Sequence, residues 1–294
     1  MKITCFGEVL WDIFPEHKKI GGAPLNVALR LHSMGIDSSI ITRIGDDTLG
    51  ANILAYIEER GMPIHTFQKD KTYKTGEVQV LLDNDNTATY DISKPVAWDF
   101  IECSDVLLNE VAQSDAFIFG SLSSRNEVSR KTLFQLLDKA TYKILDVNLR
   151  PPHYNVKLLS QLMRSANFIK LNEEEVDELC ADFHIKETLF LDKIYAIATY
   201  TQTDQICVTR GEKGATLFFE NNFYHNNGYA IKVVDTVGAG DSFLATLISE
   251  LIQGNLPQIA IDYACAVGAM VAASEGANTI FTQKEVIDFI RKHI

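Results

Sequence analysis

Two glycines and an acid stand together late in this chain, directly before a long apolar helical pattern. The segment runs from Asp235 to Phe243 and contains Gly238, Gly240 and Asp241. Such glycines let the backbone expose consecutive N–H groups at the start of a helix, where an anion such as phosphate binds. A carboxylate beside a bound phosphate is placed to accept the proton of an attacking hydroxyl. The segment suggests phosphoryl transfer to an alcohol, although a loop with Asp241 as helix N-cap explains the local pattern as well.

Two stretches near the beginning of the chain are suited to contact a polyol. Gly21 and Gly22 precede an expected helix, and the amide of Asn26 in its first turn can bridge two hydroxyls. Asp12, an acid among apolar residues after the first expected strand, can accept two hydrogen bonds. The structural alternatives are a solvated Asn26 at a loop–helix junction and an exposed turn carboxylate at Asp12.

Two further polar stretches follow expected strands, where ligands bind in open α/β sheets. Arg150, in Asp146-Val-Asn-Leu-Arg, can hold a phosphate bidentately or form a surface ion pair. Asn172 and Glu175 are three residues apart, hence on one helix face, and this pair can organise Mg²⁺ through bound waters. Helix capping by Asn172, with acids in the first turn, is the alternative.

Strands and helices alternate along the chain and must position these residues. Strands are expected at residues 3–9, 39–44, 116–119, 143–147, 168–171, 205–209, 215–219 and 222–225, and helices at 24–34, 48–60, 127–139, 156–165, 173–180, 241–253, 257–273 and 284–293. This alternation predicts a mostly parallel sheet that helices cover on both faces. No composition shift divides the chain, so one domain is expected over residues 1–294.

One expected hairpin interrupts the alternation. Residues 76–82 and 87–92 flank the turn sequence Asp83-Asn-Asp-Asn86, and Val78 and Val80 belong to an apolar face. A hairpin attached to an α/β core can be a lid, an edge extension or a dimer contact.

Composition excludes several classes of protein. The 294 residues carry a net charge of −12, which argues against nucleic acid and anionic membranes as partners. The five cysteines are scattered and form no Cys-x-x-Cys pair, so free thiols in a reducing compartment are expected. The first residues show no apolar region of a signal peptide, and no apolar run reaches the roughly 18 residues of a membrane span. These features favour a cytoplasmic protein.

The common nucleotide-binding motifs are absent from the sequence. There is no Gly-x-x-x-x-Gly-Lys-[Ser/Thr] and no set of protein-kinase loops. Gly7 stands alone after the first expected strand, which disfavours a dinucleotide-dependent dehydrogenase.

Taken together, these motifs resemble the ribokinase/PfkB family of carbohydrate kinases, in the order of that family and over nearly the whole chain. The matching stretches are Gly21-Gly22-x-x-x-Asn26-x-Ala28, Asn172-x-x-Glu175, Arg210-Gly211-x-x-Gly214, Asp235-Thr-x-Gly-Ala-Gly-Asp-Ser-Phe243 and Ser274-Glu-Gly276-Ala277. The stretches at 7–15, 21–28, 96–100 and 146–154 are most similar to the bacterial fructokinase subgroup. Ala23 stands where ribokinases carry a lysine, which disfavours ribose, and Leu25 replaces a usual small residue near the sugar.

The resemblance implies a ribokinase-like three-layer sandwich with a small β-sheet lid, built from segments near 10–22 and 64–98, through which many relatives form homodimers. It implies ATP and Mg²⁺, and in part of the family K⁺. The implied roles are a base at Asp241; an anion hole at Gly238, Ala239 and Gly240; sugar contacts at Asp12, Gly22, Asn26 and Arg150; a magnesium motif at Asn172 and Glu175; nucleotide contacts at Asn172, Arg210, Gly211, Gly214, Gly238, Gly240 and Gly276; and a monovalent-cation site at Asp235 and the Val237 carbonyl.

The resulting hypothesis is ATP-dependent phosphorylation of fructose at its 6-hydroxyl. A 2-keto-3-deoxygluconate kinase or a kinase of another ketose is the nearest alternative, since the Asp146–Arg150 stretch is compatible with both. A non-catalytic sugar- or nucleotide-binding protein is a further alternative, and the intact Gly-Ala-Gly-Asp argues against it.

Overall fold

Alternating strands and helices form a mostly parallel α/β arrangement in each of two compact units of the chain. The computed structural model describes residues 1–82 and 88–293. One unit comprises residues 1–32 and 36–141, and the other comprises residues 33–35 and 142–294.

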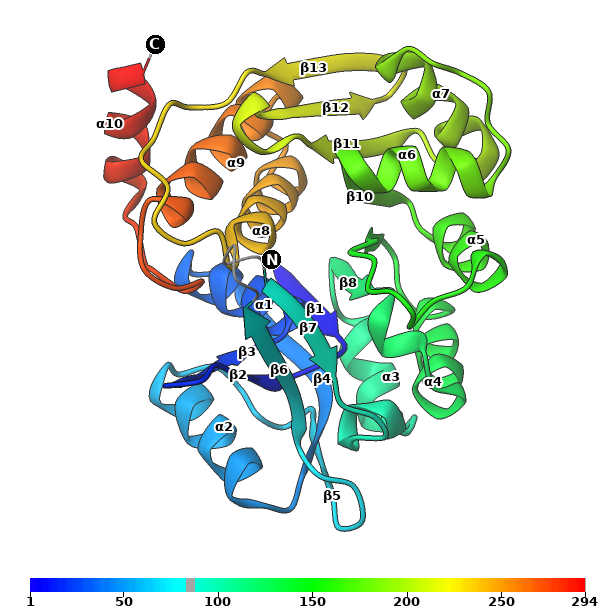
Figure 1. Cartoon of the computed structure of the whole chain (residues 1–294), viewed down its shortest axis with the longest axis vertical. Coiled ribbons are helices and arrows are strands. Elements are labelled where there is room, and N and C mark those ends of the chain that lie inside the picture. Colours follow the sequence, from blue (N-terminus) through cyan, green and yellow to red (C-terminus); the bar gives the residue numbers. More distant parts are fainter. Residues whose placement is uncertain (83–87, 294) are drawn as a thin grey trace. The chain divides into compact units, whose positions relative to one another are not determined.

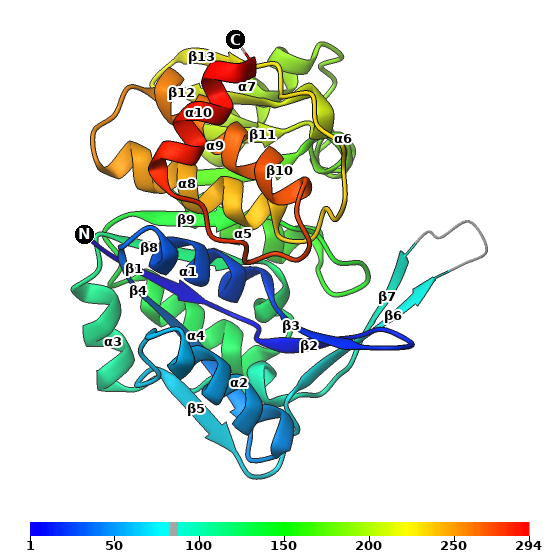
Figure 2. The ribbon, with the colours of Figure 1, turned by 90° about the vertical axis from the view of Figure 1, so that its left-hand side faces the viewer.

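The first unit contains a parallel sheet with the strand order β8-β1-β4-β5. Its strands are β1 (Lys2–Phe6), β4 (Asp37–Gly45), β5 (Phe67–Asp70) and β8 (Ala116–Gly120). The helices α1 (Ala23–Ser33) and α2 (Thr48–Glu59) lie on one side, and α3 (Asp105–Ala112) and α4 (Glu127–Leu137) on the other (Figures 1 and 2). Every residue of β8 is buried, as expected for a parallel strand covered on both faces.

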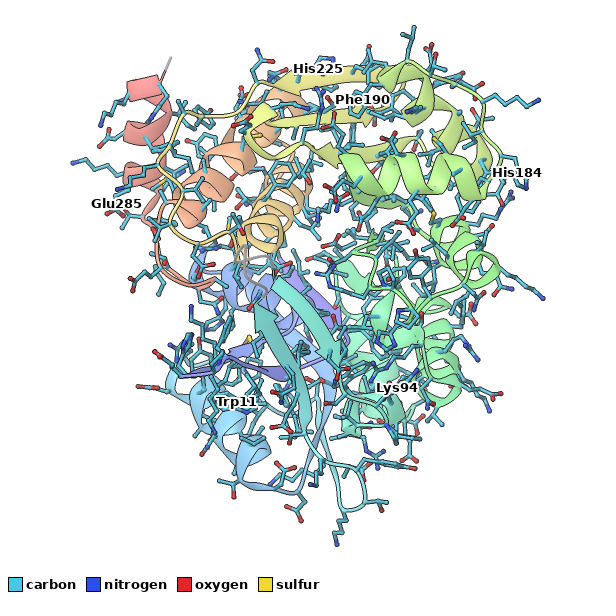
Figure 3. The ribbon with its side chains drawn as sticks, in the orientation of Figure 1. Trp11, Lys94, His184, Phe190, His225 and Glu285 are labelled. Atoms are coloured by element: carbon cyan, nitrogen blue, oxygen red, sulfur yellow. The ribbon has the colours of Figure 1, made fainter. Side chains whose placement is uncertain are left out.

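A smaller sheet belongs to the same unit and has the strand order β3-β2-β6-β7. It is built from β2 (Leu10–Ile13), β3 (Lys18–Gly21), β6 (Gly76–Leu82) and β7 (Ala88–Ile92). The expected hairpin strands are confirmed, because β6 and β7 pair antiparallel; the expected turn at 83–86 and residue 87 lie outside the described residues. Trp11 of β2, labelled in Figure 3, donates from Nε1 to the carbonyl of Leu49 at 3.1 Å and so joins this sheet to α2.

The second unit has three parallel strands extended by an antiparallel hairpin. The parallel strands are β9 (Lys143–Asp146), β10 (Phe168–Asn172) and β11 (Gln205–Thr209), and the hairpin is β12 (Ala215–Phe219) and β13 (Asn222–Asn226). The helices α5 (Val156–Ser165), α6 (Glu173–Asp182) and α7 (Phe190–Thr201) lie on one side, and α8 (Ala239–Ile252), α9 (Pro257–Ala272) and α10 (Gln283–His293) on the other (Figures 1 and 2).

The sequence pattern did not predict five elements, which are short or carry a weak start signal: β2, β3, β5, α3 and α7. The strands β2, β3 and β5 have only four residues each, too few for a clear alternation. The N-cap of α7 is Leu189, whose side chain accepts no hydrogen bond, so the usual start signal is missing. Ser104 does cap α3 through the N–H of Leu107, and that signal was available in the sequence.

Two composition-based expectations can be compared with the structure. All five cysteines are free thiols, and four of them are buried. Within the described ranges, none of the helices is both long enough and apolar enough to cross a membrane.

Candidate functional site

Gly238 forms the N-cap of α8 in a conformation that requires glycine. Its φ is +77°, in the left-handed region. A Cβ built on Gly238 would lie 2.2 Å from the Cβ of Ala277. Both the backbone angle and the neighbouring loop therefore exclude a side chain at this position.

The backbone N–H groups of the predicted anion hole differ in their partners. The N–H of Ala239 donates to the carbonyl of Thr236 at 3.2 Å and belongs to the turn itself. Over the ranges 1–82 and 88–293, the N–H groups of Gly238 and Gly240 meet no acceptor within hydrogen-bonding distance. The first turn of α8 therefore presents donors for an anion at the two glycines rather than at all three residues.

Asp235 joins this turn to the segment that follows α9. One carboxylate oxygen, Oδ1, accepts from the N–H of Val237 at 3.0 Å, and Oδ2 accepts from the N–H of Gly276 at 3.3 Å. The N–H groups of Val234 and Asp235 both donate to the carbonyl of Ala272, at 2.8 and 3.2 Å. The structure thus brings together Asp235, Val237 and Gly276, which the sequence placed in cation and nucleotide sites.

A buried ion pair joins two neighbouring strands. Lys170 of β10 is the register partner of Asp146 of β9, and its Nζ donates to Asp146 Oδ1 at 3.0 Å. The side chains are only 9% and 6% exposed. Burial alone would lower the pKa of Lys170, but the carboxylates of Asp146, Glu175 and Asp241 outweigh it and raise that pKa. Lys170 therefore carries a positive charge inside this unit.

Asn172 and Glu175 form a capping box at the start of α6. Asn172 Oδ1 accepts from the N–H of Glu175 at 2.7 Å, and Glu175 Oε2 accepts from the N–H of Asn172 at 2.9 Å. The other oxygen of Glu175, Oε1, accepts from the N–H of Leu149 at 2.7 Å. The structural alternative for Asn172 is therefore realised. Both Glu175 oxygens already accept one hydrogen bond each, and the capping box is compatible with the expected magnesium role through bound waters.

The two predicted arginines have partners within the second unit. The exposed Arg150 donates from Nη1 to the carbonyl of Leu149 at 2.9 Å. Arg210 donates from Nε and Nη2 to Glu173 Oε1, both at 3.0 Å, and its guanidinium stacks over Phe190, labelled in Figure 3. The charge of Arg210 is thus already paired.

The loop after Arg210 depends on glycine. Gly211 has φ +58° and Gly214 has φ +77°, and a Cβ on Gly214 would lie 2.0 Å from the carbonyl oxygen of Asn226. The N–H of Arg210 donates to the carbonyl of Gly214 at 2.8 Å, which closes a tight turn between β11 and β12.

The predicted sugar contacts Asp12, Gly22 and Asn26 lie close together in the first unit. Asp12 follows the first strand, as expected, but it lies inside β2, opposite Lys19, and is partly buried, so the alternative of an exposed turn carboxylate is excluded. A Cβ on Gly21 would lie 2.3 Å from Asp12 Oδ2, so the carboxylate packs against that glycine.

Gly22 and Asn26 begin α1 next to Asp12. Gly22 has φ +116°, and its Cβ would lie 2.3 Å from the carbonyl oxygen of Glu8. Asn26, whose N–H donates to the carbonyl of Gly22 at 2.9 Å, is 5% exposed. A solvated Asn26 is thereby excluded.

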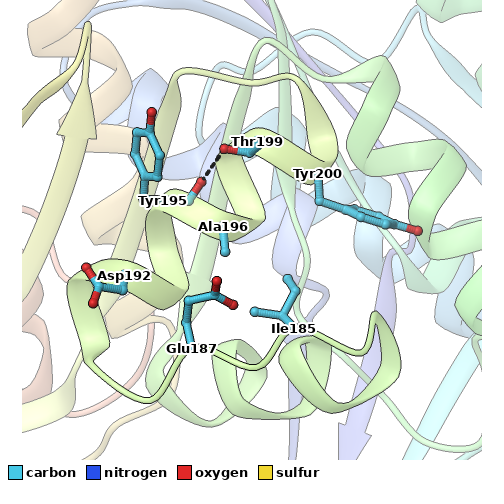
Figure 4. A pocket seen from close by; sticks show the side chains of 7 residues that line it. All are labelled: Ile185, Glu187, Asp192, Tyr195, Ala196, Thr199 and Tyr200. Carbon is cyan, nitrogen blue, oxygen red and sulfur yellow. Dashed lines mark hydrogen bonds between the residues drawn. The ribbon is translucent and has the colours of Figure 1, made fainter.

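An open depression of about 620 Å³ lies elsewhere, along α7 and the loop before it (Figure 4). Its lining includes Glu187, Asp192, Tyr195 and Tyr200, and none of the predicted site residues.

Sequence reasoning did not assign roles to Lys170 and Asp146. The available signal was a lysine inside the apolar run Phe168–Leu171 of an expected parallel strand. A strand buried on both faces accommodates a charge only when the charge is paired.

Three comparisons relate this architecture to known proteins. The sequence model described as pfkB family carbohydrate kinase matches residues 5–284, through both compact units. The fructokinase of Salmonella typhimurium is 28% identical over 302 residues, which cover 95% of each chain.

Solved structures share the fold. A fructokinase with bound ATP from Xylella fastidiosa has a TM-score of 0.87 at 21% identity, over 99% of this chain and 98% of that one. A fructokinase double mutant from Vibrio cholerae O395, in a form that binds fructose, ADP and potassium ion, has a TM-score of 0.84 at 24% identity, over 98% of both chains. The α/β architecture expected from the sequence is thus that of ribokinase-like kinases. The chain belongs to the pfkB family of carbohydrate kinases and is accordingly a phosphotransferase that acts on a sugar hydroxyl.

Proposed function

We propose that this protein transfers the terminal phosphoryl group of ATP to the 6-hydroxyl of fructose and releases fructose 6-phosphate and ADP. The observation that carries the proposal is the glycine turn at the start of α8, which presents N–H donors beside Asp241. The fructokinase of Salmonella typhimurium, and the Vibrio cholerae structure with fructose and ADP, support this choice of substrate.

Asp241 is the general base of the proposed reaction. Its carboxylate takes the proton of the sugar hydroxyl as the hydroxyl oxygen forms a bond to the terminal phosphorus of ATP. The bond between that phosphorus and the bridging oxygen breaks, and ADP leaves with the electron pair. The N–H groups of Gly238 and Gly240 stabilise the charge on the transferred phosphoryl oxygens.

Residues of this chain also suit a magnesium ion. Asp146 Oδ2 is buried and meets no hydrogen-bond donor among the described residues, and Asp146 interacts electrostatically with Glu175. We infer that Asp146, Asn172 and Glu175 hold Mg²⁺ through bound waters. When bound with ATP, Mg²⁺ neutralises phosphate charge.

A separate site for a monovalent cation is proposed near the glycine turn of α8. Asp235, with its two oxygens accepting from Val237 and Gly276, fixes the loop in which the Val237 carbonyl lies. The potassium ion in the Vibrio cholerae structure supports K⁺ as the ligand proposed for Asp235 and the Val237 carbonyl.

Polar groups of the first unit bind the sugar in this proposal. Asp12 accepts hydrogen bonds from hydroxyls, Asn26 can donate and accept, and the backbone at Gly22 allows close approach. Arg150 contributes a positive charge for the sugar phosphate, and Arg210, Gly211 and Gly214 border the nucleotide. The small sheet of β2, β3, β6 and β7 acts as a lid and as the contact of a homodimer, within one kinase domain over residues 1–294.

The five free thiols support a reducing, cytoplasmic location.

A substrate panel tests the choice of sugar. Purified protein with Mg²⁺ and ATP is assayed for ADP release with fructose, a second ketose, ribose and 2-keto-3-deoxygluconate. Fructose should give the highest kcat/KM, and the product should carry its phosphate on C6. Preference for the acidic sugar would identify a 2-keto-3-deoxygluconate kinase instead, and ADP release with none of them would favour the non-catalytic binding protein.

Substitution of the base tests the mechanism. Asp241→Asn should lower kcat by about 10²–10⁴-fold, because the hydroxyl loses its proton acceptor. The KM values for sugar and ATP should change little, and circular dichroism should confirm the fold. Turnover close to that of the wild type would remove Asp241 from the proposed role.

A further inference from the structure

Lys170 has a position that its ion pair with Asp146 does not fully explain. An ammonium group has three N–H donors. Within the part of the chain that the structure describes, Nζ of Lys170 makes one hydrogen bond, to Asp146 Oδ1 at 3.0 Å. Two donors therefore remain on a side chain that is only 9% exposed.

The remaining donors lie next to the glycine turn of α8. Gly240 has a negative φ, so its backbone does not require glycine. A Cβ on Gly240 would have one neighbour within 4 Å among the described residues outside the helix backbone: Lys170 Nζ at 3.5 Å. Lys170 Nζ thus lies beside the place that a side chain at Gly240 would take, in the first turn of α8.

The charged groups around Lys170 also favour contact between its ammonium and a bound phosphate. Asp146, Glu175 and Asp241 all interact with it electrostatically, so three carboxylates surround one ammonium. A phosphate that approached these carboxylates without Lys170 would be repelled by like charge. Backbone N–H groups carry only partial charges, whereas Lys170 supplies a full one.

We propose that Lys170 is a further catalytic residue, whose buried ammonium completes the anion hole of Gly238 and Gly240 and contacts the phosphoryl group as it is transferred. This inference rests on the proposed kinase function. Lys170 is not a base here and exchanges no proton; it stabilises negative charge that grows on the phosphoryl oxygens. Its ion pair with Asp146 holds the ammonium in place.

The test separates this role from simple neutralisation of Asp146. Lys170→Met alone leaves Asp146 buried and unpaired and can fail to fold. The informative variant is the double substitution Lys170→Met/Asp146→Asn, compared with Asp146→Asn alone, because both lack the Asp146 charge. Circular dichroism and thermal melting check that the two variants fold.

Two readouts are measured on both variants and on the wild type. The first is kcat with saturating fructose and Mg²⁺–ATP. The second is calorimetric binding of ADP and of ADP with aluminium fluoride, a mimic of the transferred phosphoryl group, each with Mg²⁺ and fructose. Relative to Asp146→Asn, the double variant should lose about 10²-fold in kcat and in affinity for the mimic, as for one lost oxyanion-hole donor. Its affinity for ADP alone should change less than about 3-fold, since ADP lacks the transferred group.

Equal turnover and equal affinity for the mimic in the two variants would overturn the proposal and leave Lys170 as the counterion of Asp146. A wild-type protein that phosphorylates fructose in that experiment keeps the proposed function intact. If the wild type itself neither turns over a sugar nor binds the mimic, the kinase function and the role of Lys170 fall together.

Discussion

Gly238 and Gly240 stand two residues apart in the same turn, and only one of them is required by the protein's own packing. A side chain on Gly238 would need a left-handed φ of +77° and would lie 2.2 Å from the Cβ of Ala277. A side chain on Gly240 would lie in ordinary contact, 3.5 Å from Lys170 Nζ. The packing of the protein therefore requires glycine at position 238 but not at position 240, where the proposed anion site gives the reason for it.

Alanine at these two positions should have opposite effects. Gly240→Ala should leave the free energy of unfolding within about 0.5 kcal/mol of wild type and lower kcat by about 10-fold or more, because the methyl group covers the anion site. Gly238→Ala should destabilise by more than about 1 kcal/mol through its backbone strain. Urea unfolding and a coupled ADP assay measure both, and full turnover in Gly240→Ala would show that no anion approaches that backbone.

The ion pair of Lys170 and Asp146 could not be predicted from the local sequence, unlike the glycine turn. The spacing of Asp235, Gly238 and Asp241 identifies the turn because its chemistry is local. Lys170 and Asp146 are 24 residues apart and become partners only through the register of β9 and β10. No local pattern encodes that register, so the pair could be suspected only from a charge inside an apolar strand.

At the scale of elements, Glu175 fixes the start of α6 to the segment after β9. Its two carboxylate oxygens accept from the backbone N–H groups of Leu149 and Asn172. The carboxyl ends of two strands are thereby held together. In the proposed reaction, the same Asn-x-x-Glu pair that caps α6 also borders the phosphate site.

Removal of the Glu175 carboxylate should lower the free energy of unfolding. Glu175→Ala leaves the buried N–H of Leu149 without an acceptor and should cost about 1–3 kcal/mol of unfolding free energy. Glu174→Ala, at the exposed neighbouring position of the same helix, is the matched control and should change stability by less than about 0.5 kcal/mol. Equal losses in denaturant unfolding would mean that Glu175 does not tether the two segments.

A second carboxylate joins elements of the first unit. Glu110 of α3 accepts from Lys2 Nζ at 2.8 Å, from Ser39 Oγ at 2.7 Å and from His65 Nε2 at 3.2 Å. Burial of the carboxyl would raise the pKa of Glu110, but these hydrogen bonds outweigh burial and lower it. The ionised form is therefore favoured by folding.

This lowered pKa predicts a loss of stability in acid. The contribution of Glu110 is complete above the ordinary glutamate pKa of about 4.3 and disappears as the pH falls through the lowered value. Glu110→Gln should cost about 2 kcal/mol at pH 7 and flatten the pH dependence of unfolding below about pH 5. Glu58→Gln, exposed on α2, should keep the wild-type slope; an unchanged slope in Glu110→Gln would contradict the prediction.

The elements themselves were largely predictable, for a physical reason. The bounds of α5, β11 and β12 are those expected, because apolar periodicity and turn residues mark both ends of each. The four-residue strands β2 and β3 carry too little pattern. They exist because β2 pairs with β3 on one side and with β6 on the other, and no local sequence reveals these hydrogen bonds.

At the scale of the whole molecule, the net charge of −12 opposes an anionic substrate. ATP must approach against this field, whereas the proposed sugar substrate, fructose, is neutral and does not sense it. The cationic groups at the site are local, and Lys170 is buried. Screening by salt should weaken the exposed charges more than the buried one.

Salt should therefore affect the two substrates differently. Choline chloride at about 150 mM shortens the Debye length to about 8 Å and should lower the KM for Mg²⁺–ATP by roughly a few-fold. The KM for fructose should stay constant and serves as the internal control. Choline is too large for a site of the proposed K⁺ type, so the effect reports screening. A nucleotide KM that rises with salt would place the dominant attraction on exposed cations.

Family membership follows from motifs spread over the whole sequence, but the placement of side chains does not. Asp12 lies within a strand that no pattern announced, and Arg210 is paired with Glu173. Both outcomes depend on neighbours distant in the sequence. The sequence therefore predicts the chemistry better than the contacts that organise it.

The contrast between Gly238 and Gly240 extends to the evolution of this protein. Selection for a folded chain is enough to retain Gly238, because its φ and its contact with Ala277 leave no alternative. In the proposed reaction, Gly240 is needed for turnover and not for folding, so selection retains it only while the protein is catalytic. In a gene duplicate released from catalysis, substitutions would accumulate at position 240 before position 238, and a side chain at 240 would mark a descendant that keeps the fold after losing the reaction.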